Sequence, residues 1–334
     1  MLDQTEKEIM STWQNSNPLV TIRCLAYNHE QYISQTLDGF FMQKTNFPFE
    51  ILVHDDASTD NTATIIREYA NKYPNIIKPI YQKENQYSKH DGTISRIMDS
   101  LTKGKYIAIC EGDDYWIDEN KLQMQVDFLE NNPEYGMCYT KAKSFFQDKS
   151  TFSKNTTGQY VKDFEDLLIN GNRIPTLTTV YRKDILFNYQ NEINPLGKGW
   201  LMGDLPKWLY IFYNSKIKFI DEVTAVYRVL EESASHSSDI NKQLKFVNSA
   251  YDIRYFYINK FNLDYDLTTY HSRAILREYA KSLFQKYNSK VAKEFRDYYK
   301  TAIYKSKKFD LYSFLSHSVI TWKFVKFLKI IFKQ

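Results

Sequence analysis

The chain has 334 residues, of which 43% are hydrophobic and 25% charged, a balance that excludes an intrinsically disordered protein. Its three cysteines include no CxxC pair, which argues against a disulfide framework or a zinc knuckle and favours a reducing, cytoplasmic location. Only ten residues are glycine, which argues against a glycine-rich phosphate loop. No run of 18 apolar residues predicts a membrane-spanning helix, and the polar residues 1–17 predict no signal peptide.

Charge is distributed unevenly along the chain. Residues 241–334 contain 19 Lys and Arg but 7 Asp and Glu, a net charge of +12. The whole chain carries +4, so residues 1–240 carry −8. This asymmetry predicts that the two parts contact different partners. We expect no nucleic-acid partner, because no recognised binding motif accompanies the basic residues.

Strand and helix patterns alternate over the first third of the chain. Apolar, β-branched runs predict strands at residues 19–26, 49–53, 76–81 and 106–110. The helices expected between them are residues 33–41, the segment from Asp60 to Pro74, and residues 95–101. This order predicts a parallel sheet with right-handed crossovers.

The second third continues the mixed pattern, and the last third is helical. A helix capped by Asp118 and a helix beginning at Asp204 are expected. Residues 144–172 are polar and irregular, which predicts a loop over a groove. From about residue 241 the pattern is helical. The further strands are predicted at residues 135–140, 176–181, 217–220 and 223–228.

Carboxylates cluster where two predicted strands end. Asp55 and Asp56 follow one strand, and Glu111, Asp113 and Asp114 follow another. Open α/β sheets bind ligands at the carboxyl ends of their strands, so both clusters can meet over one edge. Clustered carboxylates repel one another and usually need a cation or strong donors. Mg²⁺ and Mn²⁺ suit such ligands and bridge phosphates, so the pattern predicts a metal-diphosphate site.

Taken in order, these motifs resemble family 2 glycosyltransferases of the GT-A fold. The resemblance rests on Tyr27-Asn28, residues 55–60 (DDASTD), 103–107 (KGKYI) and 111–116 (EGDDYW), Gly203-Asp204, and Tyr227-Arg228. It implies an α/β fold with a mostly parallel central sheet flanked by helices. The division it implies is an extension (1–17), a glycosyltransferase domain (18–238, with a nucleotide-binding half 18–116 and an acceptor half 117–238), and a helical, basic C-terminal region (239–334).

The resemblance implies that residues 55–60 hold the base of the donor nucleotide. A carboxylate can accept a hydrogen bond from uracil N3–H, so we expect a UDP-sugar, with Asp56 as the first candidate and Asp55 as the second. A polar turn with a helix cap is the alternative interpretation. Ala57 stands where the family usually has Gly, and we expect the backbone to tolerate it. The other expected nucleotide contacts are Tyr27, Asn28, Arg96, Asp113 and Arg228.

Glu111, Asp113 and Asp114 occupy the place of the family's Asp-x-Asp motif, with Glu as a departure at its first position. We expect Asp114 to bind Mn²⁺ or Mg²⁺ directly and Asp113 to contact the donor ribose or the metal's waters. His236 is expected to complete the metal shell and Arg228 to neutralise the leaving diphosphate. A solvated turn and a surface histidine are the alternatives.

Asp204 corresponds to the family's catalytic base. By itself it is also a good helix cap, and a helix N-terminus keeps a carboxylate charged. The implied reaction is an inverting transfer of a sugar to a hydroxyl of a saccharide or lipid-linked saccharide, in bacterial surface polysaccharide synthesis.

Lysines alternate with bulky apolar residues in the segment 320–333. Lys323, Lys326, Lys329 and Lys333 gather towards one side of a helix, which is typical of helices that lie on anionic membranes. We therefore expect a peripheral protein at the inner face of the cell membrane. A C-terminal helix packed on the protein body is the alternative.

Two other functions remain open. A sugar-phosphate nucleotidyltransferase would also use carboxylates and Mg²⁺, but it should carry a glycine-rich loop after the first strand, where residues 27–30 contain no glycine. A non-catalytic module that binds nucleotide sugar or polysaccharide is disfavoured by the presence of both the base candidate and the metal acids.

Overall fold

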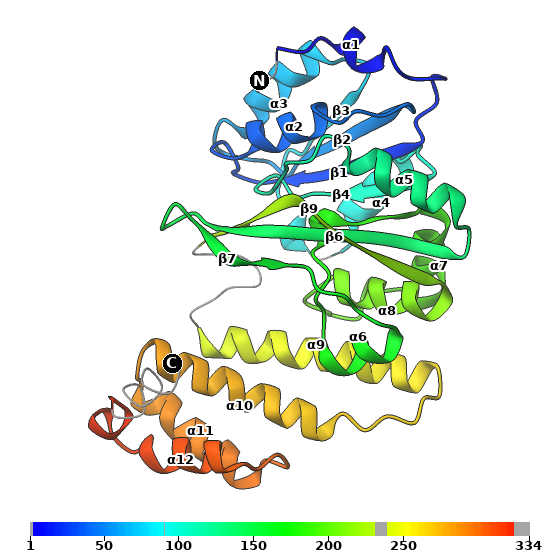
Figure 1. Cartoon of the computed structure of the whole chain (residues 1–334). Coiled ribbons are helices and arrows are strands. Elements are labelled where there is room, and N and C mark those ends of the chain that lie inside the picture. Colours follow the sequence, from blue (N-terminus) through cyan, green and yellow to red (C-terminus); the bar gives the residue numbers. More distant parts are fainter. Residues whose placement is uncertain (1–2, 90, 231–238, 324–334) are drawn as a thin grey trace. The chain divides into compact units, whose positions relative to one another are not determined.

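A computed structural model describes residues 3–89, 91–230 and 239–323 of the chain (Figure 1). The chain divides into two compact units. The first contains Met1–Gly199 and Lys207–Leu230, and the second contains Trp200–Pro206 and Glu231–Gln334. The division at residues 17 and 238 stays a prediction.

Within the described residues, the first unit contains a sheet of nine strands. The strands are β1 (Val20–Ala26), β2 (Phe49–Asp55), β3 (Ile77–Tyr81), β4 (Tyr106–Ile109), β5 (Tyr115–Trp116), β6 (Tyr135–Phe146), β7 (Thr151–Thr157), β8 (Val180–Arg182) and β9 (Lys216–Val229). Their order is β3-β2-β1-β4-β8-β6-β9-β5, with β7 paired to β6. β1 to β4, β6 and β9 run in one direction, because β8 pairs antiparallel with both β4 and β6.

Helices flank this sheet (Figure 1). They are α1 (Glu6–Met10), α2 (Ile33–Phe41), α3 (Thr62–Lys72), α4 (Thr93–Leu101), α5 (Lys121–Asn131), α6 (Phe164–Asn170) and α7 (Lys183–Ile193), with 3₁₀ turns η1 (Tyr87–Lys89) and η2 (Thr176–Thr178). Helix α8 (Asp204–Asn214) begins in the second unit and continues into the first. The predicted α/β fold with a mostly parallel central sheet is confirmed.

Aromatic side chains fill the space between the sheet and α2. Phe40 and Phe41 are fully buried on α2. Phe40 meets the indole of Trp116 edge-on at 4.8 Å, and Phe41 stacks on Tyr73 at 3.9 Å. Such pairs add to the large apolar area that each ring buries. They hold α2 against β5 and the end of α3.

The strand predictions were correct for β1 to β4, and the helix predictions for α2 to α4 lie within two residues of the structure. The predicted loop at 144–172 was wrong, because β6 extends to Phe146 and is followed by β7 and α6. The two short strands predicted at 217–228 are one strand, β9, that pairs with β6 through several register shifts. Asp118 accepts a hydrogen bond from Asn120 N–H (2.8 Å), but α5 begins only at Lys121.

The second unit is helical, as predicted. Its helices are α9 (Ile240–Lys260), α10 (Thr268–Gln285), α11 (Ser289–Thr301) and α12 (Lys307–Leu315). α10 packs against α9 and α11, and Phe295 and Trp322 lie buried in the aromatic core. Among the described residues, no helix is long and apolar enough to cross a membrane. Residues 324–334, which hold most of the predicted membrane-binding segment, lie outside the described residues.

Candidate active site

Loops at one edge of the sheet carry most of the predicted nucleotide- and metal-binding side chains. β1 lies between β2 and β4 and runs parallel to both, so the carboxyl ends of the three strands share an edge. Tyr27-Asn28 follows β1, Asp55-Asp56 spans the end of β2, and Glu111 to Asp114 follow β4. The parallel topology therefore brings the two acidic clusters to the same edge.

Backbone contacts hold these loops together. The Asp56 N–H donates to the Ala26 carbonyl (2.9 Å), and the Gly112 N–H donates to the Leu25 carbonyl (2.8 Å). A Cβ atom on Gly112 would lie 2.8 Å from Nδ1 of His29. The acidic loop therefore needs glycine at this position, because any side chain would collide with the loop after β1.

The loops after β1 and β2 are joined through Asn28. Its N–H donates to the Ser58 hydroxyl (2.9 Å), and its side-chain oxygen accepts from the Thr59 N–H (2.8 Å). Asn28 and Ala57 have φ of 55° and 61°, in the left-handed region. Asn adopts this region readily, whereas Ala pays about 1 kcal/mol or more for it. The backbone thus accepts Ala57, as predicted, but with strain.

Asp55 and Asp56 are both buried, with exposed fractions of 3% and 4%. The two carboxylate oxygens of Asp56 accept from the Gln86 N–H (2.8 Å) and the Tyr87 N–H (2.9 Å), which anchors the loop after β3. Among the described residues, Oδ1 of Asp55 has no hydrogen-bond partner. An ionised carboxylate has about four acceptor positions, so both residues keep capacity for a ligand's N–H group.

Arg228, at the end of β9, holds the acidic loop in place. Its N–H donates to Oδ1 of Asp114 (2.7 Å), and its Nε donates to the Asp113 carbonyl (2.7 Å). Its terminal nitrogens donate to Gln147 (2.9 Å) and Gln35 (2.8 Å). This network gives Arg228 a structural role, and its predicted contact with a leaving diphosphate stays a prediction.

Aromatic rings enclose the Arg228 guanidinium. Its central carbon lies 4.7 Å from the centroid of Tyr32 and 5.1 Å from that of Tyr115. Both distances allow a cation–π attraction, which strengthens where water is excluded. The positive charge behind the acidic loop is therefore fixed in position.

Asp114 lies in an environment that opposes its negative charge. Burial raises its pKa well above the usual range, and the charges of Asp113 and Glu111 raise it further, whereas Arg228 lowers it. The carboxylate of Asp114 accepts one hydrogen bond from the described residues, and it does so through Oδ1. Oδ2 accepts none from them. A cation beside these carboxylates would relieve the repulsion.

The donor set fits Mn²⁺ or Mg²⁺, which prefer carboxylate oxygens and often use few protein ligands beside phosphates. No group of three or more His, Cys, Asp or Glu side chains in the described residues is arranged to hold a metal by itself. Substrate oxygens would therefore have to complete the shell. His236, the predicted additional ligand, lies outside the described residues.

The remaining candidates occupy local positions. Tyr27 is 45% exposed after β1. Arg96 lies in the first turn of α4 and donates to the Asp91 carbonyl (2.8 Å) and the Thr93 hydroxyl (2.9 Å). Asp204 is the first residue of α8, as predicted, and its carboxylate accepts from the Leu205 N–H (2.7 Å). Asp204 lies in the second unit and the acidic loops lie in the first.

Sequence reasoning missed two bases near these loops, the half-buried His29 and the buried Lys121. His29 has a buried Nδ1 without a hydrogen-bond partner among the described residues. Burial lowers the pKa of His29, although the negative charge of Asp113 acts to raise it. Lys121 is fully buried, donates to Gln125 (2.7 Å), and lies 4.2 Å from the Trp116 ring. Burial lowers the pKa of Lys121 to about 8. The only signal in the sequence was the proximity of both residues to acidic motifs.

Residues 24–187 match the family model for glycosyl transferase family 2. This part of the chain belongs to glycosyltransferase family 2. The family 2 region includes the edge that holds Asp56 and Asp114, and the resemblance stated from the sequence is confirmed. The chain therefore carries a glycosyltransferase domain.

Other proteins are similar to this chain in sequence. A Mycobacterium tuberculosis protein is 34% identical over 224 residues, which cover 66% of this chain and 61% of that protein. This chain therefore spans less than two thirds of that relative. The Escherichia coli UDP-Glc:alpha-D-GlcNAc-diphosphoundecaprenol beta-1,3-glucosyltransferase WfaP is 34% identical over 112 residues, 34% of this chain and 41% of WfaP.

A solved structure shares the fold of this chain. The crystal structure of Staphylococcus aureus TarS 1-349 in complex with UDP-GlcNAc aligns with a TM-score of 0.57 and 15% sequence identity. The alignment covers 92% of this chain and 90% of that chain. This likeness confirms the GT-A fold.

Proposed function

We propose that the protein transfers a sugar, with inversion, from a UDP-sugar to a hydroxyl of a saccharide acceptor. The observation that carries this proposal is the convergence of the Asp55-Asp56 and Glu111 to Asp114 loops at one sheet edge, inside the region that matches family 2. The first loop offers carboxylates to a nucleotide base, and the second offers them to a cation with a diphosphate. The UDP-GlcNAc bound to TarS and the UDP-Glc in the name of WfaP support a UDP-linked donor.

Such a transfer needs a base for the acceptor hydroxyl and a positive charge for the departing diphosphate, and the chain has candidate groups for both. Asp204 takes the proton of the acceptor hydroxyl as that oxygen attacks the anomeric carbon, and UDP leaves on the opposite side of the sugar. Asp204 is the first residue of α8, and a helix N-terminus interacts favourably with a negative charge. Asp114 and Asp113 would hold Mn²⁺ or Mg²⁺, which neutralises the departing diphosphate.

The acceptor is proposed to be a lipid-linked saccharide used in bacterial surface polysaccharide synthesis. The acceptor in the name of WfaP is a sugar on diphosphoundecaprenol, which supports this class. The net charge of +12 on residues 241–334 would hold the protein on the inner face of the cell membrane. Deletion of residues 324–334, which spares the buried Trp322, should weaken binding to anionic liposomes, and unchanged binding would remove the tail from this proposal.

Release of nucleoside diphosphate tests the donor. The purified protein is incubated with UDP-, dTDP- and GDP-sugars, with Mn²⁺ or with EDTA, with and without lipid-linked acceptors. We expect metal-dependent release from UDP-sugars. If no donor gives release under any of these conditions, the protein is a binding module rather than an enzyme.

The Asp204→Asn variant tests the base. We expect turnover to fall by at least about 100-fold, because a positioned base contributes about 10²–10⁴ in rate, while UDP binding is unchanged. Asp239→Asn, at the N-cap of α9, makes the same chemical change at another helix start and should keep its activity. Equal activity of both variants would reject Asp204 as the base.

A further inference from the structure

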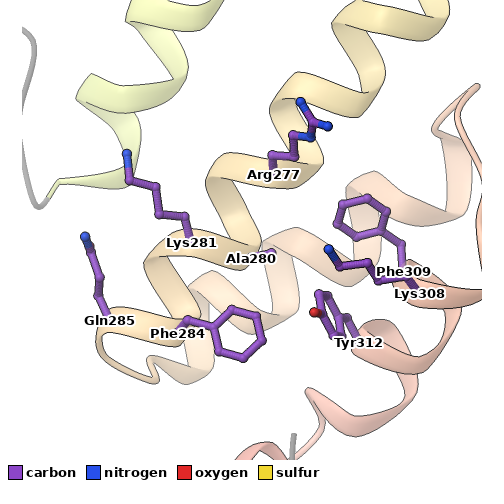
Figure 2. Close-up of a pocket in the computed structure, with 8 residues that line it drawn as sticks. All are labelled: Arg277, Ala280, Lys281, Phe284, Gln285, Lys308, Phe309 and Tyr312. Carbon is purple, nitrogen blue, oxygen red and sulfur yellow. The ribbon is translucent and has the colours of Figure 1, made fainter. Parts of the chain in front are cut away.

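A pocket in the second unit combines positive charge with aromatic surface. It lies between α10 and α12 and has a volume of about 320 Å³ (Figure 2). That size falls at the lower end of the range of small-molecule sites. The lining residues are Arg277, Ala280, Lys281, Phe284, Gln285, Lys308, Phe309 and Tyr312.

Three cations approach the pocket from two helices. Arg277 and Lys281 stand four residues apart on α10, so they occupy neighbouring positions on one helix face, and Lys308 comes from α12. Lys281 pairs with Glu278 at 3.3 Å. Within the described residues, Arg277 and Lys308 make no hydrogen bond or ion pair. None of the lining residues is acidic, so the pocket attracts an anion.

The floor of the pocket is apolar. Ala280, Phe309 and Tyr312 are buried, with exposed fractions of 8% or less. Phe284 meets Tyr312 edge-on at 5.3 Å, and Nζ of Lys308 lies 5.7 Å from the Tyr312 ring. Figure 2 shows Lys308 beside the Tyr312 and Phe309 rings, with Arg277 further along α10. A free phosphate would leave this aromatic surface uncovered, whereas an amphiphile would use both the charge and the rings.

A different face of α12 from the one that carries Phe309 and Tyr312 also presents apolar side chains. Leu311 and Phe314 are 43% and 73% exposed, and they follow Lys307 at spacings of four and seven residues, so the three share one face. Exposed apolar side chains beside lysines are typical of surfaces that enter the interface of an anionic membrane.

We propose that this pocket binds the phosphate headgroup of an anionic phospholipid, while Leu311 and Phe314 enter the acyl-chain boundary. Arg277 and Lys308 hold the phosphate oxygens, and the Phe284 and Tyr312 rings pack against the glycerol and the first methylenes. This site does not depend on glycosyl transfer, and it differs from the C-terminal tail. It assigns lipid binding to the described helices α10 and α12.

Flotation of the full chain with vesicles of phosphatidylglycerol or of phosphatidylcholine tests the site. We expect binding to phosphatidylglycerol and a loss of affinity of at least about tenfold in the double variant Arg277→Gln/Lys308→Gln. The control Lys290→Gln/Lys293→Gln removes the same charge from exposed positions of α11 and should lose less than about threefold. Equal losses in the two variants would show diffuse attraction and overturn the pocket.

Two further measurements separate the pocket from other sources of binding. Ala280→Leu fills the pocket without a change of charge and should weaken vesicle binding as the double variant does, with circular dichroism used to verify its fold. Full affinity in a folded Ala280→Leu variant would overturn the proposal. Millimolar inorganic phosphate should compete only weakly. Strong competition, or a loss of binding that follows only from deletion of residues 324–334, would also overturn it.

Discussion

The two units of the chain treat charge in opposite ways. In the first unit, Asp55, Asp56 and Asp114 are almost fully buried at the edge of the sheet. In the second unit, every described Lys and Arg except Arg254 and Arg296 is exposed, and the buried core is mostly aromatic and aliphatic. Burying carboxylates costs free energy unless donors or cations compensate, whereas burying rings is favourable. The comparison therefore indicates that the first unit gives up stability for a charged ligand and the second keeps its charges available at the surface.

The buried acids show how that cost is limited. Asp56 receives two backbone N–H groups, and Asp114 receives one from Arg228. Hydrogen bonds to a charged acceptor are stronger than those between neutral groups. The remaining repulsion among Asp114, Asp113 and Glu111 is the part that a ligand can relieve. Four substitutions test this view of the two units.

The largest effect is expected for Asp114→Asn. The carboxamide is nearly isosteric but loses the charge that binds a cation, so turnover should fall by about 1,000-fold, equivalent to about 4 kcal/mol of transition-state stabilisation. Nucleoside diphosphate release measures the loss. Stability should not decrease, because the variant removes a buried charge.

Asp118→Asn makes the same chemical change a few residues further along the chain. Its carboxylate accepts only from the Asn120 N–H among the bonds described, so turnover should stay within about twofold of the unmodified protein. If Asp114→Asn kept its turnover or lowered stability strongly, the acids would be structural, and the contrast between the two units would fail.

The second unit should respond to the loss of a ring instead. Phe295 is fully buried. Its ring centroid lies 6.2 to 6.3 Å from those of Tyr279, Tyr299 and Phe309. Phe295→Ala should lower the free energy of unfolding by at least about 3 kcal/mol, because it removes buried apolar area and leaves a cavity. Chemical denaturation measures the change.

Phe314→Ala is the matched control, since Phe314 is 73% exposed on α12. It should change the free energy of unfolding by less than about 0.5 kcal/mol. Similar losses at Phe295 and Phe314 would mean that the aromatic core does not carry the stability of the second unit.

The same contrast explains what could be predicted from the sequence. β1, β2 and β4 consist mostly of buried and largely apolar residues, and acids follow β2 and β4 at the edge of the candidate site, so both features were visible in the pattern. β7 is mostly exposed and contains one large apolar side chain, Phe152, so it carries no alternation that indicates a strand. It forms because β6 offers it a pairing partner.

The partners of Arg228 show a second limit. Gln147 is 81 residues away from it in the chain and Gln35 is 193 residues away. Contacts over such separations depend on the completed fold, and no local motif encodes them. The sequence pattern therefore predicted Arg228 as a site residue but did not reveal that it holds the acidic loop.

Lys121 sharpens the comparison, because it is a buried cation in the unit that buries acids. Its pKa is lowered by burial from 10.5 to about 8. The unfolded chain therefore binds more protons than the folded chain between these values, and stability should rise as pH increases from about 8 to about 10.5. From pH 7.5 to 9.5 we expect a gain of about 2 kcal/mol relative to Lys121→Met, measured by urea denaturation.

The exposed Lys103 provides the control for this slope. Lys103→Met should follow the pH dependence of the unmodified protein. If Lys121→Met kept the slope, the proton uptake would belong to other groups, and Lys121 would be satisfied by Gln125 and Trp116 in its charged form.

The smallest effect tests backbone strain beside the acidic edge. Ala57 has φ of 61°, so Ala57→Gly should raise the free energy of unfolding by about 0.5–1 kcal/mol, the strain relieved less the extra freedom of Gly in the unfolded chain. Ala70→Gly within α3 should lower it by about 1 kcal/mol. If the change from Ala to Gly stabilises the protein at position 57 and destabilises it at position 70, the loop around Asp56 is held in a backbone conformation that alanine disfavours. A loss at both positions would mean that the hydrogen bonds that join Ser58 and Thr59 to Asn28 need the stiffer residue between them and Asp56.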